Sequence, residues 1–229
     1  MIKLILVRHG QSTYNKQNRF TGWINAKLTE EGIKEAQQAG KILKKQNYTF
    51  DIAYTSVLKR SEDTLKYILK ELGEENIKIK KTYKLNERHY GALQGLNKQK
   101  TKEKYGEEQV KLWRRSLTEK PPALTKEDKR YPGNSPKYKN LKEEELPLTE
   151  SLKDTMKRVV KYYEEEITKE LKSNKKVIVV AHGNSLRALV AHLDNMKEKD
   201  ITNLEIPTGQ PICYELDNNL KPIKHYYLK

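Results

Sequence analysis

Short apolar runs alternate along the chain with longer segments in which apolar residues recur every three or four positions. The strongest runs are residues 2–7, interrupted only by Lys3, and residues 177–181. Continuous runs of this length are typical of strands that are buried on both faces of a sheet. Further extended segments are predicted at residues 51–55, 77–85, 211–216 and 222–227.

Helical periodicity fills the intervals between these runs. One helix is predicted to begin after Thr29, where two glutamates provide the acidic first turn that helices favour. Others are predicted over residues 58–72, over residues 151–171 as one continuous stripe, and after residue 181. This alternation predicts an α/β fold, a three-layer sandwich with a mostly parallel central sheet and helices on both faces.

Residues 121–147 interrupt the alternation. They contain five of the eight prolines, few apolar residues and no helical period. We therefore expect one domain over residues 1–229, with a loop-rich insertion at about residues 121–147 that is either ordered or a mobile lid.

Composition narrows the class of protein. The lone Cys213 excludes an internal disulfide and a cysteine-based zinc site. No apolar run approaches the length of a membrane span, and the N-terminus lacks the cleavage site of a signal peptide, so we expect a cytoplasmic protein.

The formal net charge of +15 favours acidic partners. Lysines are interleaved with glutamates as on solvated helix faces, and no basic run carries interleaved aromatics, so we expect neither nucleic acid nor a membrane as partner. Arginine is scarce, and six of the nine fall in the segments discussed below: Arg8, Arg60, Arg88, Arg114, Arg115 and Arg187. Because arginine can bind phosphate and carboxylate through two parallel hydrogen bonds, this distribution indicates recognition of small anions.

The two strongest strands end in the same type of motif. His9-Gly10-Gln11-Ser12 follows the first, and His182-Gly183-Asn184-Ser185 follows the second. Because the carboxyl ends of parallel strands share one edge of a sheet, we expect the two histidines to face each other across one pocket.

Two histidines in this arrangement could serve three kinds of chemistry. A zinc site of His9, His182 and Glu87 is disfavoured because the neighbouring Arg8 and Arg60 would repel the metal ion. A serine hydrolase is disfavoured because the second motif lacks the closing glycine of G-x-S-x-G. Phosphoryl transfer is favoured, since a neutral imidazole is a nucleophile and arginines neutralise the moving phosphoryl group.

The motifs LVRHGQSTYN, TGW, ERHYGALQGLNK, WRRS and AHGNSLRAL resemble the cofactor-dependent phosphoglycerate mutases of the histidine phosphatase superfamily. The resemblance runs in order from residue 2 to about residue 228. RHG alone would indicate only the superfamily, whereas ERHYGALQGLNK together with WRRS is more specific for the mutases.

The resemblance implies a role for each matching residue. His9 would be phosphorylated, Glu87 would exchange a proton with the substrate hydroxyl, His182 would stabilise the transferring group, and Arg8 and Arg60 would neutralise its charge. The implied substrate-binding residues are Arg8, Ser12, Asn15, Thr21, Gly22, Arg60, Glu87, Tyr90, Lys98, Arg114, Arg115, Gly183 and Asn184.

The function implied by the resemblance is interconversion of 2-phosphoglycerate and 3-phosphoglycerate in glycolysis and gluconeogenesis. The enzyme would be primed by 2,3-bisphosphoglycerate, would need no metal, and would form a homodimer or a tetramer. A broad-specificity histidine phosphatase and a non-enzymatic phospho-ligand binding protein are the alternatives.

The end of the sequence departs from the family pattern. Members usually carry a polar tail after the last strand that helps to cover the pocket, whereas this sequence stops at Lys229. Water attacking phosphohistidine would make a phosphatase, so we expect more hydrolysis of bisphosphoglycerate than in tailed relatives, with residues 121–147 as the remaining cover.

Overall fold

The central sheet has six strands, and the computed structural model describes residues 1–229. The strands are β1 (Ile2–Arg8), β2 (Ile52–Thr55), β3 (Lys78–Lys81), β4 (Val177–Ala181), β5 (Pro211–Leu216) and β6 (Pro222–Tyr227). Their spatial order is β3, β2, β4, β1, β5 and β6. The first four in this order are parallel, whereas β5 is antiparallel to both β1 and β6. The prediction of a mostly parallel sheet is confirmed.

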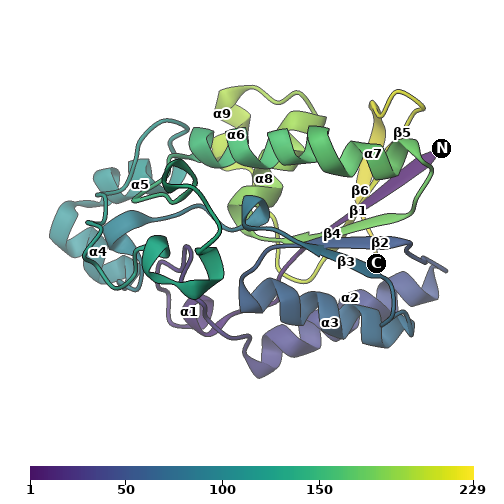
Figure 1. Ribbon diagram of the computed structural model, residues 1–229, viewed down its shortest axis with the longest axis horizontal. Helices are drawn as coiled ribbons and strands as arrows, with labels where there is room; N and C mark the ends of the chain where they lie inside the picture. The colour runs from purple at the N-terminus through teal and green to yellow at the C-terminus, as the bar shows by residue number, and fades with distance from the viewer.

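Helices cover both faces of this sheet, which confirms the predicted three layers (Figure 1). One face carries α2 (Glu30–Lys45) and α3 (Lys59–Leu72), and the other carries α6 (Leu152–Tyr162), α7 (Thr168–Lys172) and α8 (Gly183–Leu193). The remaining helices are α1 (Thr13–Lys16), α4 (Lys98–Tyr105), α5 (Glu107–Arg115) and α9 (Glu198–Asn203). None of the helices combines the length and the apolar character that crossing a bilayer requires.

Both faces of β1 are buried in apolar clusters. Leu4 and Leu6 belong to the cluster that contains side chains of α6 and α8. Ile5 and Val7 belong to the cluster that contains side chains of α2 and α3. Because successive strand residues point to opposite faces, a strand between two helical layers must be apolar at successive positions wherever both faces are covered, as they are from Leu4 to Val7. This requirement explains the continuous apolar run that predicted the strand.

Two predicted elements differ from the structure. The segment predicted as extended over residues 77–85 forms β3 and then a 3-10 turn at Tyr83–Leu85, where the Thr82 hydroxyl accepts a hydrogen bond from the Lys84 N–H. The helix predicted over residues 151–171 is interrupted between α6 and α7 by a π-helical turn at Tyr163–Ile167. The cap at Thr82 and the π-helical turn do not change the spacing of apolar residues, so the hydrophobic pattern cannot reveal them.

The insertion at residues 121–147 is ordered by contacts with the segment around residue 92. It contains three 3-10 turns, Pro132–Asn134, Pro136–Tyr138 and Glu143–Glu145. The Ala92 N–H donates to the Pro122 carbonyl at 2.8 Å, and the Tyr138 ring packs against Trp23 with centroids 5.1 Å apart. The insertion therefore packs against Ala92 and Trp23, and none of its residues lines the cavity described below, which it was expected to cover.

The loop after β1 passes very close to α2. A Cβ built on Gly10 would lie 2.1 Å from the Gly32 carbonyl oxygen, which is backbone and cannot rotate away. Gly10→Ala is therefore expected to lower the free energy of unfolding by about 3 kcal/mol, the cost of severe overpacking. Urea denaturation would measure this loss.

Gly183→Ala is the matched control for stability. A Cβ at Gly183 would meet only ordinary contacts, the nearest at 3.5 Å from Arg8. An unchanged denaturation midpoint for Gly10→Ala would contradict the close approach of the loop to α2.

Candidate active site

The two histidines lie side by side because β1 and β4 are neighbours in the sheet. Arg8 and Ala181 are partners in the parallel register, so the next residue of each strand, His9 and His182, leaves the sheet at the same level. The ring centroids are 4.9 Å apart with an angle of 60° between the planes. Both rings are buried, with exposures of 2% for His9 and 0% for His182.

Hydrogen bonds fix the orientation of the neutral His9 ring, which in this form can act as a nucleophile. Nδ1 lies 2.7 Å from the Gly10 carbonyl and donates its proton there, and Nε2 accepts from Arg60 Nε at 3.2 Å. This pattern leaves the lone pair on Nε2. Burial, followed by the charges of Arg60 and Arg8, holds the pKa of His9 well below 6.5, so the ring carries no charge near neutral pH.

The His182 ring is hydrogen-bonded through Nε2, and its other nitrogen, Nδ1, has no partner. Its Nε2 is 2.7 Å from the Ser56 hydroxyl, which is itself 2.5 Å from the Ser61 hydroxyl. Burial, then Arg60 and His9, lowers the pKa of His182 as well. Nδ1 is buried without a partner. The direction of the Ser56–Nε2 hydrogen bond depends on the tautomer of the ring. In the tautomer in which Ser56 donates to Nε2, Nδ1 carries the ring proton and can donate it to a phosphoryl oxygen.

Two arginines stand beside the histidines in different settings. Arg60, from α3, is fully buried, and it donates to the carbonyls of Ile24 at 2.9 Å and Gly22 at 2.8 Å as well as to His9. Arg8 donates to the Ile206 carbonyl at 2.6 Å, while its Nε is buried without a partner. Arg60 therefore orients His9 from within the protein, whereas Arg8 keeps a donor free for a ligand.

The Glu87 carboxylate is held only by backbone groups. Its Oε1 accepts from the Arg88 N–H at 2.8 Å and from the Asn184 N–H at 3.1 Å. The side chain lines the pocket and is 9% exposed as a residue. A carboxylate in this place can exchange a proton with a bound hydroxyl.

A cavity of about 110 Å³ opens at this edge of the sheet. Its lining residues are Arg8, Asn15, Arg19, Phe20, Thr21, Gly22, Glu87, Tyr90, Lys98, Arg114, Arg115, Gly183, Asn184, Arg187 and Glu205. Every predicted substrate-binding residue is among them except Ser12 and Arg60. The hydroxyl of Ser12 bonds the Asn15 side chain at 2.8 Å and caps α1, so Ser12 supports the wall rather than facing the cavity.

Three charged lining residues were not predicted from the sequence. Arg187 lies one helical turn after Gly183 on α8, donates to the Leu204 carbonyl at 2.9 Å and contacts the Asn184 side chain. Its place on the same helix face was a usable signal. Arg19 and Glu205 lie in loops, and nothing local in the sequence marks them. Glu205 forms an ion pair with Arg115 at the rim.

The cavity is strongly cationic. Six of its lining side chains are basic, Arg8, Arg19, Lys98, Arg114, Arg115 and Arg187, against the carboxylates of Glu87 and Glu205. Burial, then Arg114 and Arg8, lowers the pKa of Lys98 to about 8. No group of three or more histidine, cysteine or acidic side chains is arranged as a metal site. The arrangement suits a small ligand with more than one anionic group.

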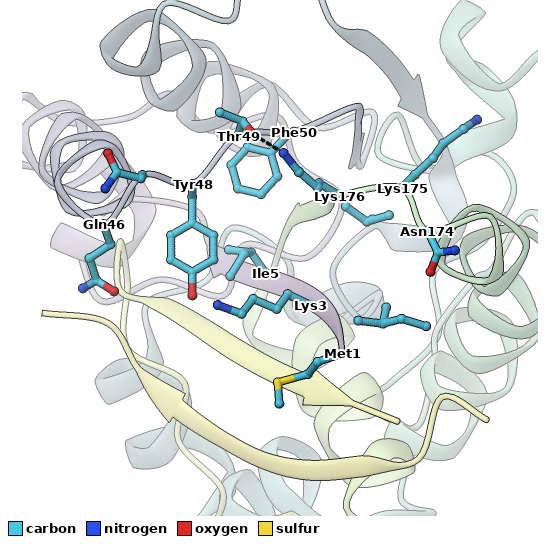
Figure 2. A pocket seen from close by; sticks show the side chains of 13 residues that line it. Met1, Lys3, Ile5, Gln46, Tyr48, Thr49, Phe50, Asn174, Lys175 and Lys176 are labelled. Atoms are coloured by element: carbon cyan, nitrogen blue, oxygen red, sulfur yellow. Dashed lines mark hydrogen bonds between the residues drawn. The ribbon is translucent and has the colours of Figure 1, made fainter. Parts of the chain in front are cut away.

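A second, larger cavity of about 340 Å³ lies at the amino end of β1 and β4 (Figure 2). Lys3, Lys175 and Lys176 line it, and Lys176 Nζ bonds the Thr49 hydroxyl at 2.7 Å. No histidine and no carboxylate lines it. It has no counterpart to Glu87, which lines the first cavity.

Comparisons with known proteins agree with this geometry. The model of the family described as "Histidine phosphatase superfamily (branch 1)" matches residues 4–130 and 123–228. Among solved structures, the chain is similar to a mycobacterial glucosyl-3-phosphoglycerate phosphatase at 22% identity, with a TM-score of 0.71 and coverage of 99% of this chain and 97% of that one. It is also similar to the alpha-ribazole phosphatase from Shigella flexneri at 17% identity, with a TM-score of 0.73 and coverage of 99% and 96%.

Proposed function

Since this chain belongs to the histidine phosphatase superfamily, we propose that it is a phosphoglycerate mutase, which interconverts 2-phosphoglycerate and 3-phosphoglycerate through phosphorylated His9. The observation that carries this proposal is the second group of cations, Lys98, Arg114 and Arg115, on the wall of the cavity. A phosphatase needs cations around the transferred phosphoryl group, which Arg8 and Arg60 supply. Additional cations suit a substrate with a second anionic group, such as the carboxylate of a phosphoglycerate.

The proposed reaction uses two transfers in opposite directions. His9 arrives phosphorylated and its phosphoryl group is attacked by the free hydroxyl of the monophosphoglycerate, so the N–P bond breaks as the new O–P bond forms. Glu87 accepts the hydroxyl proton. The bisphosphate then turns in the cavity, and Nε2 of His9 attacks its other phosphoryl group while Glu87 returns the proton to the departing oxygen. The cycle ends with His9 phosphorylated and Glu87 ionised, as it began, and no metal takes part in it.

The cofactor in this proposal is 2,3-bisphosphoglycerate, which supplies the first phosphoryl group. Arg8 and His182 would bind the phosphoryl oxygens, since each presents a buried nitrogen without a partner. Neutralisation of these oxygens is the main contribution that a protein makes to phosphoryl transfer.

A second candidate is a histidine phosphatase, in which water attacks phosphorylated His9. It is favoured by the stated activities of the two solved structures above, both phosphatases. At the identities given, these structures share the fold with this chain. Phosphorylation of His9 would be the same in both candidates. The acceptor of its phosphoryl group would differ: a phosphoglycerate in the mutase and water in the phosphatase.

A coupled mutase assay separates the two candidates. The proposal expects conversion of 3-phosphoglycerate that depends on added 2,3-bisphosphoglycerate and is unaffected by a chelator. Phosphate release from the same preparation is measured in parallel. Rapid phosphate release without conversion would favour the phosphatase, and loss of activity in chelator would contradict the metal-free mechanism.

The pH dependence of substrate binding tests the role of Lys98. Because its pKa is lowered to about 8, Lys98 is charged below pH 8 and loses its charge above it. A monophosphate ester is fully ionised above pH 7, so the substrate does not titrate there. We expect KM to rise about tenfold between pH 7 and pH 9.5, the worth of one charge-assisted hydrogen bond. Lys98→Arg keeps its charge throughout and should abolish the rise; a parallel rise in both proteins would contradict this role.

A further inference from the structure

The main chain around Glu87 is irregular and lies outside the sheet. Residues 86–90 follow the 3-10 turn at Tyr83–Leu85 and have neither helical nor strand structure. Since the Glu87 carboxylate is bonded only to backbone N–H groups, its place depends on where this segment lies. Irregular backbone in a buried wall needs hydrogen-bond donors from elsewhere in the protein.

A single guanidinium supplies most of these donors. Arg158, on α6, donates to the carbonyls of Lys84 at 2.8 Å, Asn86 at 2.9 Å and Glu87 at 2.9 Å. Its two remaining N–H groups go to the Glu150 carboxylate at 2.7 and 2.9 Å. All five donors of the guanidinium are therefore in use.

Glu150 completes the clamp from the other side. Its carboxylate also accepts the His89 N–H at 2.8 Å, and its own N–H donates to the His89 carbonyl at 2.9 Å. The side chains of Glu150 and Arg158 are only 7% and 12% exposed. Burying an ion pair contributes little to stability because of its desolvation cost. Here the pair instead fixes the backbone on both sides of Glu87.

We propose that Arg158, held by Glu150, is a positioning residue that sets the place of the Glu87 carboxylate over the cavity. The inference rests on the proposed role of Glu87 as proton carrier. Trp23 also supports the main-chain carbonyl of Glu87, because its Nε1–H donates to the carbonyl oxygen with 2.6 Å between nitrogen and oxygen. A lysine at position 158 would keep the charge but could not span three carbonyls and a carboxylate.

Arg158→Lys is the test, with Arg130→Lys as the matched control. Arg130 is a similar fork, which pairs with Asp128 and donates to the carbonyls of Ala92 and Gln94. Arg158→Lys is expected to lower kcat about 10- to 100-fold, since displacement of a catalytic group by about 1 Å can cost that much. KM should change less than about twofold, and Arg130→Lys should leave kcat within about twofold of wild type.

A double variant distinguishes positioning from general destabilisation. If Arg158 acts through Glu87, then Glu87→Gln with Arg158→Lys should be no slower than Glu87→Gln alone. Turnover is measured in whichever reaction, mutase or phosphatase, the wild type performs. Additive losses would overturn the positioning role while leaving the proposed function intact. If Glu87→Gln turned over at the wild-type rate, Glu87 would not be the proton carrier, and the positioning role of Arg158 would fall with it.

Hydrogen exchange gives a readout that does not depend on activity. The amides of residues 84–91 should exchange at least about tenfold faster in Arg158→Lys and at the wild-type rate in Arg130→Lys. Trp23→Phe removes the indole N–H together with part of the buried ring, and provides a second variant if Arg158→Lys fails to fold; it should lower kcat in the same non-additive way. Unchanged exchange in Arg158→Lys, or unchanged turnover in both variants, would overturn the proposal.

Discussion

Replacing His9 with alanine is expected to abolish turnover and to prevent labelling of the protein by radioactive 2,3-bisphosphoglycerate. In the proposed reaction the imidazole is the leaving group of the first transfer and the nucleophile of the second, and its burial beside Arg60 and Arg8 keeps it unprotonated. Removal of a nucleophile leaves only the contribution of binding and charge stabilisation, so kcat should fall by at least about 10⁴-fold. The substrate cavity should survive, because His9 lies beneath it and does not line it.

His192→Ala is a suitable control for this experiment. His192 lies near the other end of α8, beside Glu164 at 3.6 Å, and it does not line the cavity. It should keep both turnover and labelling. A label on the wild-type protein that is acid-labile, base-stable and absent from His9→Ala would support phosphohistidine at position 9. A His9→Ala protein that still becomes labelled would show that His9 is not the phosphorylated residue.

Replacing Glu87 with glutamine is expected to slow turnover while leaving label on His9 detectable. Glutamine has the same shape, and its oxygen can still accept from the N–H groups of Arg88 and Asn184. It cannot carry the proton, so kcat should fall by about 10²- to 10⁴-fold. Single-turnover measurements with 2,3-bisphosphoglycerate would show the label accumulating slowly on the intact nucleophile.

Glu205→Gln provides the matched control, because Glu205 is the other carboxylate that lines the cavity. Its side chain is 66% exposed and pairs with Arg115 at the rim, away from the histidines. We expect its kcat to stay within a few-fold of wild type. A turnover number unchanged by Glu87→Gln, or lowered equally by both variants, would contradict the role of Glu87.

The strands that the sequence predicted best are those marked by a distinct residue pattern, whether they are buried throughout, as β4 and β5 are, or lie exposed at the edge of the sheet, as β6 does. The bounds predicted for β4, β5 and β6 agree with the structure because apolar or β-branched runs and prolines mark them. The 3-10 turn after Thr82 and the π-helical turn in residues 163–167 were missed because each depends on hydrogen bonds that do not change the apolar pattern.

The candidate site divides in the same way. His9 and His182 could be brought together from the sequence alone, since parallel neighbouring strands must end at one edge. The residues that hold the two histidines and Glu87 in place could not be identified from the sequence. Ser56 and Arg158 contact the site from segments far away in the chain, and no local pattern reveals where a long-range hydrogen bond will form.

The pairing of β1 with β4 ties assembly of the site to synthesis of the chain beyond Ala181. A chain still growing on the ribosome acquires His9, Arg60 and Glu87 early, but the strand that brings the second imidazole begins only at Val177. Until β4 has left the exit tunnel, β1 has no parallel neighbour. The cavity then also lacks Gly183 and Asn184, which follow β4 and line it. In the proposed reaction, radiolabel on His9 would therefore report chains that have been synthesised and folded beyond His182.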